Sequence, residues 1–375
     1  MTNSFTMNTT SRLWYIDNLR IFLISLVVLH HFAITYGAPG SWYYNETEAG
    51  FPEIIPLLLF VLTNQSFFMG MFFFISAFFI LPSLKRKGTA KFLKDRFIRL
   101  GIPLLLFYFI LSPLTVFIHH RFILGDEVSL IDFWINQKGT GFGPLWFVEA
   151  LLLFTLLFLL VKTVKVNRQI PFPGAFAILL AAITTGFIQY LIRIWLPVGW
   201  SMPFTNFQFP FFVQYVFLFV LGIVAYKNNW LDSITLKTGK KWFLFAQFVL
   251  FIVFPTVFIL GGSFEEADLF MGGGTWQSAG YAILEQVLGF SLIIGLLGLA
   301  GKSVNRQVNF ARQLSGSAYG VFVFHAPVIV AVSAFFVSWQ ISPLLKFIFL
   351  APLALIACFL IAWLAKKIPF SRNVF

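Results

Sequence analysis

Charged residues are scarce in this chain. Lys, Arg, Asp and Glu together make up 11% of its 375 residues, whereas 59% are hydrophobic and the mean hydropathy is +0.87. Soluble globular domains carry roughly a quarter of their residues as charges. The composition therefore excludes an ordinary soluble domain and predicts a polytopic membrane protein.

Cysteine is almost absent as well. Cys358 stands alone, so neither a disulfide framework nor a cysteine metal site can form. We expect no bound metal, because His119 and His120 have no evident third ligand near them. No small-residue cleavage site follows the first apolar segment, which we therefore expect to persist as an uncleaved first span.

About ten apolar segments are long enough to cross a bilayer, and all should be helical because only helices satisfy their own backbone groups in lipid. They cover approximately 16–36, 54–82, 97–118, 144–161, 172–193, 209–226, 242–260, 279–300, 316–338 and 344–365. The second is long and carries Asn64, Gln65 and Ser66, so we expect it to tilt or break. We expect an all-α fold in which residues 1–375 form one transmembrane domain. It includes a short cytoplasmic N-terminal segment, 1–12, and a cytoplasmic tail, 366–375.

Basic residues concentrate in alternate loops, which predicts that both termini are cytoplasmic and that the protein lies in the cell membrane. The basic loops hold Lys85, Arg86, Lys87, Lys91, Lys94, Arg96 and Arg99, then Lys162, Lys165 and Arg168, then Lys227, Lys237, Lys240 and Lys241, then Lys302, Arg306 and Arg312, and finally Lys366, Lys367 and Arg372. The intervening loops hold Glu46, Glu48 and Glu53, then Asp126, Glu127 and Asp132, then Glu265, Glu266 and Asp268, with only Arg121, Lys138, Arg193 and Lys346 as basic exceptions. The net charge of +12 thus reflects topology and contact with membrane lipid, and nucleic acid is not expected as a partner.

Arg20 and His31 lie inside the first apolar segment, with Asp17 one turn before the arginine. Ionisable groups at mid-helix cost about 2.5–3.5 kcal/mol each in a membrane, so they are retained mainly where they have a function. Eleven residues make about three full turns, which places Arg20 and His31 on one helix face, ~16 Å apart along the axis. This face can bind something at the membrane edge and act on it deeper in the bilayer.

His31 is the best candidate for a general base, because a neutral imidazole can take a proton from a hydroxyl near neutral pH. Glu149 lies at a matching depth in the fourth span and could orient it. The alternative is a buried histidine that bonds a backbone carbonyl; the arginine on the same face favours catalysis. Glu285 and His325 are further intramembrane groups, each a structural or acceptor-binding candidate.

Arg96 and Arg99 stand three residues apart at the predicted cytoplasmic end of the third span. Arginine presents a planar fork of donors that suits phosphate. Together with Arg20 they could form an anion site. The alternative is ordinary positive-inside anchoring, which an i,i+4 pair between Asp95 and Arg99 would support.

Five motifs in order resemble the acyltransferase 3 family over essentially the whole chain. They are Asp17-Asn-Leu-Arg20 followed by His31, Phe72-Phe-Phe-Ile-Ser76, Arg96-Phe-Ile-Arg99 followed by Pro103, Gly143-Pro-Leu-Trp146-Phe147, and Ser317-Ala-Tyr319 continuing to His325-Ala-Pro327. Within that family the chain is most similar to glucan-succinylating members. The resemblance implies a membrane O-acyltransferase that moves an acetyl or succinyl group from cytoplasmic acyl-CoA to a hydroxyl of an extracytoplasmic glycan or other acceptor.

The resemblance also implies site residues. His31 would be the catalytic base, supported by Arg20 and Asp17, while Arg96 and Arg99, with Ser76, would lie near the coenzyme. Trp146 joins the structural or acceptor-binding candidates. The second hypothesis is a proton-coupled transporter or flippase in which His31, Glu149, Glu285 and His325 form a relay; the absence of an inverted repeat counts against it.

Overall fold

The computed structural model describes residues 13–136, 141–161, 169–306, 308–369, 371 and 374. Ten helical spans occur in these ranges, as predicted, and no strand is found within them. The spans are Trp14–Thr35, Ile54–Lys87, Thr89–Leu124, Gly143–Val161, Ala175–Arg193, Phe209–Lys227, Leu236–Leu260, Trp276–Ser303, Asn309–Phe335 and Pro343–Ala365. The expected segment 1–12, together with Lys138, Lys162, Lys165, Arg168 and Arg372, lies outside the described residues.

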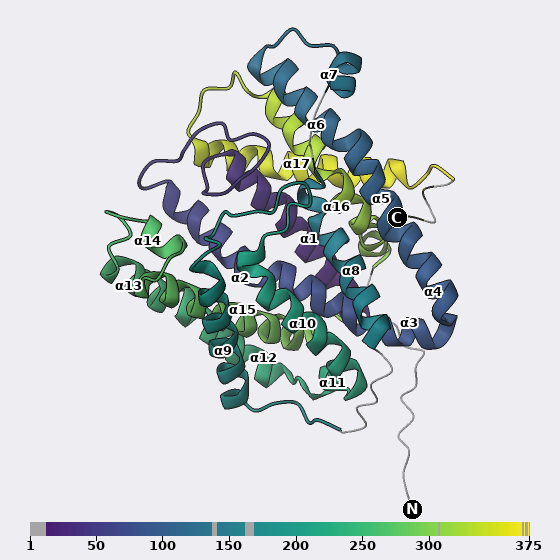
Figure 1. The fold of residues 1–375 in the computed structure, drawn as a ribbon, viewed down its shortest axis with the longest axis vertical. Helices are drawn as coiled ribbons and strands as arrows, with labels where there is room; N and C mark the ends of the chain where they lie inside the picture. The colour runs from purple at the N-terminus through teal and green to yellow at the C-terminus, as the bar shows by residue number, and fades with distance from the viewer. Residues whose placement is uncertain are drawn as a thin grey trace, which may run out of the picture.

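Four helices form the centre of the bundle, and the others pack around them (Figure 1). The central helices are α1 (Trp14–Thr35), α2 (Ile54–Phe78), α15 (Trp276–Ser303) and α16 (Asn309–Phe335). In the apolar window of α15, 78% of the residues are buried, compared with 22% in Leu236–Leu260. The most buried span therefore also carries Glu285, the one acidic residue in α15.

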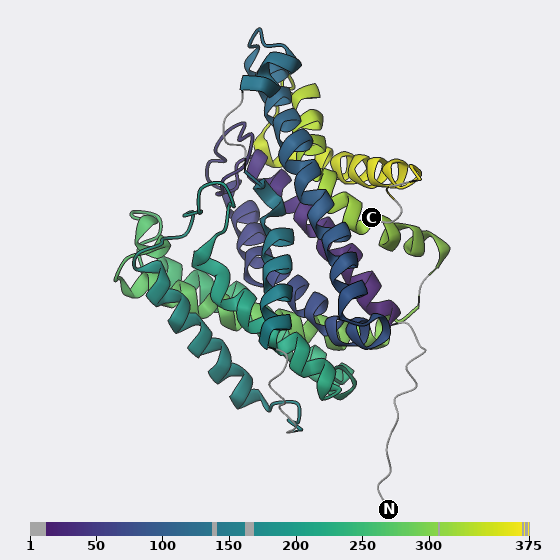
Figure 2. The ribbon, with the colours of Figure 1, turned by 45° about the vertical axis from the view of Figure 1, so that its right-hand side comes forward.

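Peripheral helices complete the bundle. They are α8 (Trp146–Val161), α9 (Ala175–Arg193), α10 (Phe209–Lys227), α12 (Leu236–Phe248) with α13 (Phe254–Leu260), and α17 (Pro343–Ala365). Short helices lie in the connections, namely α7 (Leu130–Asn136), α11 (Trp230–Ser233) and α14 (Asp268–Met271). Figure 2 shows α17 projecting from the side of the bundle opposite α9.

The second span does break, but not at its polar triplet. It bends at Phe79, between α2 and α3 (Ile80–Lys87), and α4 (Thr89–Arg96) begins after Gly88, whose φ of 74° allows the tight turn. Asn64, Gln65 and Ser66 instead stay helical. Ser66 Oγ donates to the Thr63 carbonyl and Gln65 Nε2 donates to the Tyr215 hydroxyl, whereas Asn64 Nδ2 is buried with no partner among the described residues.

The third span alternates between α-helical and π-helical turns. The π-helical segments are η1 (Phe97–Gly101), η2 (Phe107–Leu111) and η3 (His119–Leu124), and they flank α5 (Ile102–Leu106) and α6 (Ser112–Ile118). Proline has no N–H and clashes with the carbonyl four residues earlier, so the helix must widen before it. Pro103 and Pro113 each follow a π-helical segment by two residues, and Pro255 follows η5 (Val249–Val253) in the same way.

Contacts between segments far apart in the sequence connect the elements at each end of the bundle. Asn18 Nδ2 donates to the carbonyls of Val304 and Arg306, which ties the start of α1 to the loop between α15 and α16. At the other end of α1, the Lys346 ammonium of α17 pairs with the Glu46 carboxylate in loop 36–53. We refer to these as the basic end and the acidic end of the bundle, after the charges of their loops.

Candidate active site

The helix α1 is continuous from Trp14 to Thr35, so Arg20 and His31 lie on one straight element as predicted. Arg20 is at the basic end, where its Nη1 is 3.3 Å from Asp17 Oδ1 and its guanidinium lies over the Phe79 ring, 5.0 Å from the centroid. Phe79 is the residue at which the second span bends, so the bend brings an aromatic face to Arg20. Ser76, half-buried, is one turn earlier in α2 and thus on the same side as Phe79.

The three predicted arginines gather at the basic end. Arg96 ends α4, Arg99 lies in η1, and both Arg20 and Arg99 are close enough to Arg96 for their charges to interact. The Arg96 guanidinium also lies over the Phe92 ring at 5.0 Å. Like charges held together repel one another, so a cluster of this kind favours an anion bound between them.

The alternative that Arg96 and Arg99 only anchor the third span is weakened, because Asp95 hydrogen-bonds to Lys87. Its Oδ2 is 2.5 Å from Lys87 Nζ, at the junction of α3 and α4. This ion pair bridges the turn at Gly88, and Asp95 also lies close enough to Arg99 for their charges to interact.

Tyr319 on α16 fixes the position of Arg99. In an α-helix the Arg99 carbonyl would accept the N–H of residue 103, but that residue is proline and has none. The Tyr319 hydroxyl donates to this carbonyl at 2.6 Å instead. Because Pro103 leaves the Arg99 carbonyl without its helical donor, this carbonyl can accept from Tyr319, which connects the arginine motif to α16.

His31 lies near the acidic end in a group of aromatic rings. The Trp42 ring stacks on it, with centroids 3.9 Å apart and planes 17° apart, and His325 of α16 lies 5.3 Å away at 22°. His30 meets His31 edge-on at 5.5 Å and packs against Phe68. The structure thus brings together the first and ninth spans at the proposed base.

Each histidine in this group has a ring nitrogen that is buried with no hydrogen-bond partner among the described residues. These atoms are Nδ1 of His30, Nδ1 of His31 and Nε2 of His325. The indole nitrogen of Trp42 is in the same condition. Buried polar atoms normally find partners, so four such atoms close together make this place a candidate site for a polar ligand.

Glu149 does not orient His31 through its buried oxygen. Glu149 Oε2 and His31 Nδ1 are both buried, and neither has a hydrogen-bond partner in the described part of the chain. The residue sits in the first turn of α8, next to Phe147, whose ring packs on Phe322 of α16. Its catalytic role stays a prediction.

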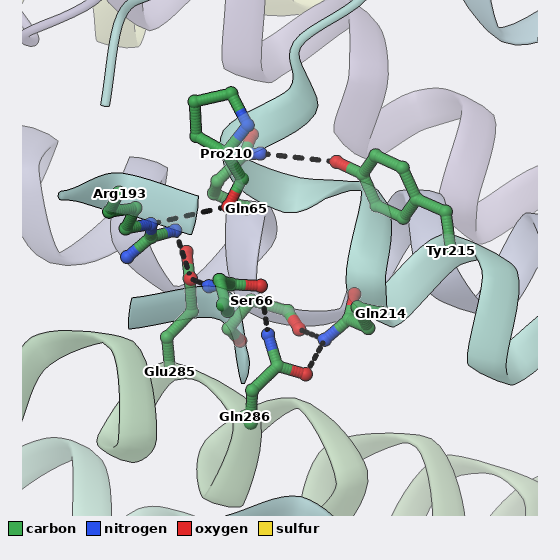
Figure 3. A network of polar contacts seen from close by, with 9 residues as sticks. Gln65, Ser66, Arg193, Pro210, Gln214, Tyr215, Glu285 and Gln286 are labelled. Atoms are coloured by element: carbon green, nitrogen blue, oxygen red, sulfur yellow. Dashed lines mark hydrogen bonds and ion pairs between the residues drawn. The ribbon is translucent and has the colours of Figure 1, made fainter. Parts of the chain in front are cut away.

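Glu285 belongs to a buried polar network with Arg193 and several glutamines (Figure 3). Arg193 Nη2 donates to Glu285 Oε2 at 2.6 Å, Gln189 Nε2 donates to the same oxygen, and the Arg193 guanidinium is sandwiched between the rings of Phe211 and Tyr281. Arg193 Nε also donates to the Pro210 carbonyl. These contacts favour the structural alternative for Glu285, and its part in a relay with His31 stays a prediction.

Glutamine side chains extend this network to α2. Gln286 Nε2 donates to Gln189 Oε1 at 2.8 Å, and Gln214 Nε2 donates both to Gln286 Oε1 at 3.0 Å and to the Ser66 carbonyl at 2.7 Å. The network therefore joins α2, α9, α10 and α15. Trp146 is likewise used for packing, since its ring stacks on Tyr215 of α10 at 5.5 Å.

Sequence reasoning missed two of these residues. Arg193 was noted only as a basic residue at the acidic side; its isolation there was the available signal. Trp42 gives no signal in the sequence, because its loop is positioned by contacts from the far end of the chain. These are the Lys346–Glu46 pair and the Leu344 N–H that donates to Glu53, while Tyr44 of the loop itself donates to Glu46 Oε2.

No group of three His, Cys, Asp or Glu side chains is arranged as metal ligands within the described ranges. His120 Nδ1 is 2.7 Å from Asp126 Oδ2, an exposed contact that closes the turn after η3. His120 therefore has a local structural partner in Asp126.

Comparison with known proteins agrees with the geometry. The family model of the acyltransferase 3 domain matches residues 13–363. Glucans biosynthesis protein C of Escherichia coli strain K12 is 23% identical over 342 residues, which cover 86% of this chain and 84% of that protein. The protein of that name from Shigella dysenteriae serotype 1 is 23% identical over 345 residues with the same coverage. No solved structure matches the chain significantly. The family model covers most of the chain, and the chain accordingly belongs to the acyltransferase 3 family of membrane O-acyltransferases.

Proposed function

We propose that the protein transfers an acyl group from acyl-CoA, entering at the basic end, to a hydroxyl group that enters from the acidic end. Arg20, Arg96 and Arg99 would hold the coenzyme phosphates. The pantetheine arm would run along α1 and bring the thioester to His31, across the ~16 Å that eleven helical residues span. With the basic end in the cytoplasm, donor and acceptor would come from opposite sides of the membrane.

His31 would act as general base. It takes the proton of the acceptor hydroxyl as the oxygen attacks the thioester carbonyl carbon. The new C–O bond forms, the C–S bond breaks, and the departing CoA thiolate receives the proton from the imidazolium of His31. No acyl-enzyme is required in this direct transfer.

One observation carries this proposal. The single helix α1 carries Arg20 at one end, near Arg96 and Arg99, and His31 on the same face at the other end, beside buried nitrogens that have no partner in the described chain. A binding protein would need the arginines alone. The relatives named for glucan biosynthesis support a glucan or other glycan as the acceptor. The acyl group would be succinyl or acetyl.

The base is tested by acyl transfer to a purified glucan with acetyl-CoA and succinyl-CoA as donors. We expect His31→Ala to lower kcat by at least about 100-fold, the lower range for general bases. His119→Ala is the matched control, because that histidine lies outside the ring cluster, and it should retain transfer. Undiminished transfer by a folded His31→Ala protein would contradict the assignment.

The donor site is tested separately by acyl-CoA binding to the purified protein. Arg96→Ala should weaken binding about tenfold or more, since a charge-assisted bond to phosphate contributes roughly 1.5–3 kcal/mol. Arg86→Ala removes an exposed basic residue of the same loop and should leave binding unchanged. If both substitutions weakened acyl-CoA binding equally, Arg96 would contribute only general positive charge and not a specific phosphate contact.

A further inference from the structure

We infer that Trp42 and His325 form, with His31, a subsite that binds a second hydroxyl group of the acceptor, so that the enzyme selects acceptors with neighbouring hydroxyls. This inference rests on the proposed function and concerns the same site.

Trp42 determines the direction from which a substrate can reach His31. A centroid distance of 3.9 Å between nearly parallel rings is close to the contact distance of stacked atoms, so the indole covers one face of the imidazole. A reacting hydroxyl must therefore approach the edge of the His31 ring, where its nitrogen lone pairs lie.

His325 lies beside this pair. Its centroid is 5.3 Å from that of His31 and 5.8 Å from that of Trp42, with planes 22° and 18° from theirs. Distances this long, beside a 3.9 Å stack, place the His325 ring next to the stack rather than within it. The edges of the two imidazoles consequently border one small region of space.

The tautomer of His325 follows from its one hydrogen bond. Its Nδ1 is 2.6 Å from the Phe322 carbonyl oxygen, which can only accept, so Nδ1 carries the proton and donates. In the neutral ring Nε2 is then an acceptor. This atom belongs to a residue with no exposed surface and has no partner among the described residues.

The subsite therefore needs a ligand with several polar groups close together. The Nε2 of His325 requires a donor, as does the His31 nitrogen that acts as the base, whereas the indole N–H of Trp42 requires an acceptor. A hydroxyl group is both donor and acceptor. A single hydroxyl can satisfy His31 alone, while two neighbouring hydroxyls can satisfy both imidazoles and offer an oxygen to Trp42.

The test compares two ring-matched model acceptors, trans-1,2-cyclohexanediol and cyclohexanol, with the full-length protein and acetyl-CoA or succinyl-CoA. We expect kcat/KM for the diol to exceed that for the mono-alcohol by about tenfold or more, because the mono-alcohol leaves buried polar atoms unpaired. His325→Phe should bring this ratio close to one by raising KM for the diol, with little change for cyclohexanol. His325→Gln, which keeps an acceptor oxygen, should restore part of the ratio.

A purely structural role for His325 would lower transfer to both alcohols equally, and that result would overturn the inference. A wild-type protein without diol preference would overturn it as well. Trp42→Phe provides an independent variant if His325→Phe fails to fold, since it keeps a ring on His31, removes the N–H and should also reduce the ratio. Loss of all transfer in His31→Ala, combined with an unchanged ratio in His325→Phe, would reject this subsite while leaving the proposed function intact.

Discussion

At the scale of single residues, buried charge carries a large free-energy cost, and the Arg193–Glu285 pair offsets much of it: the two side chains bond each other, although Arg193 Nη1 and Glu285 Oε1 are buried with no hydrogen-bond partner among the described residues. Both side chains are almost fully buried, and the pair is enclosed by two aromatic rings and a glutamine. Removing one partner of a buried pair is costly because the other charge is left uncompensated.

Glu285→Gln should therefore lower the free energy of unfolding by about 3 kcal/mol or more, the range for broken buried pairs. The double variant Arg193→Gln/Glu285→Gln should be more stable than Glu285→Gln, because no lone charge remains. Asp95→Asn, which breaks the half-exposed pair with Lys87, should cost about 1 kcal/mol or less. Denaturant unfolding in detergent micelles would measure all three, and equal losses for Glu285→Gln and Asp95→Asn would contradict this reading of the network.

Tyr36, just beyond the end of α1, gives a prediction on pH. Burial raises the pKa of its hydroxyl to about 12 from the ordinary 10.0, and the charge of Glu46 also acts in this direction. At pH values between 10.0 and about 12, the unfolded chain releases this proton and the folded chain keeps it. The free energy of unfolding therefore falls as the pH rises through this range.

The variant Tyr36→Phe should lose less stability than the parent between about pH 9 and pH 11, because it has no proton to release. Thermal unfolding at both pH values measures the difference. If parent and variant lost equal stability, the buried hydroxyl would not contribute to the alkaline transition.

At the scale of elements, glycine determines where α15 can approach its neighbours. A Cβ on Gly289 would lie 2.0 Å from the Ser66 carbonyl oxygen of α2, and one on Gly298 would lie 2.6 Å from the Cα of Gly239 in α12. Small residues at such crossings allow the close helix contact on which membrane bundles depend. Gly301, in the same helix, has nothing within 4 Å.

Two substitutions in α15 separate packing from helix propensity. Alanine stabilises a helix by up to about 1 kcal/mol relative to glycine, so Gly301→Ala should be neutral or slightly stabilising. Gly289→Ala carries the same propensity gain but should be destabilising, because backbone atoms of α2 must move. Unfolding midpoints of the two variants would decide, and similar midpoints would show that α2 and α15 can separate freely.

Element boundaries and types were largely predictable, because they depend on local sequence. Apolar length located the ten spans, and eleven-residue spacing put Arg20 and His31 on one face. The bend at Phe79 was predicted only as a break somewhere in the second span. Asn64, Gln65 and Ser66, whose polarity led to that prediction, stay helical, and the tertiary partner of Gln65, Tyr215, is not visible in local sequence.

At the scale of the whole molecule, the distribution of charge predicts the orientation in the membrane. The chain's own cysteine, Cys358, has no exposed surface, so introduced cysteines can be labelled without background. Glu127→Cys and Glu265→Cys should react with a membrane-impermeant thiol reagent in intact cells, and Lys240→Cys only after permeabilisation. The reverse pattern would place the termini outside and would invert the direction of acyl transfer.

The sequence by itself determined the membrane class, the number of spans, the separation of basic and acidic loops, and the Arg20–His31 face, because each depends on helix periodicity or bilayer thickness. Only the tertiary structure placed Trp42 and His325 beside His31, enclosed Glu285 with Arg193, and fixed Arg99 through Tyr319. Most of these contacts join residues about 90 to 300 positions apart in the sequence. The position of Trp42 depends on one of them, the pair between Lys346 and Glu46. Their geometry follows from how helices pack in three dimensions, and periodicity along one helix carries no information about that packing.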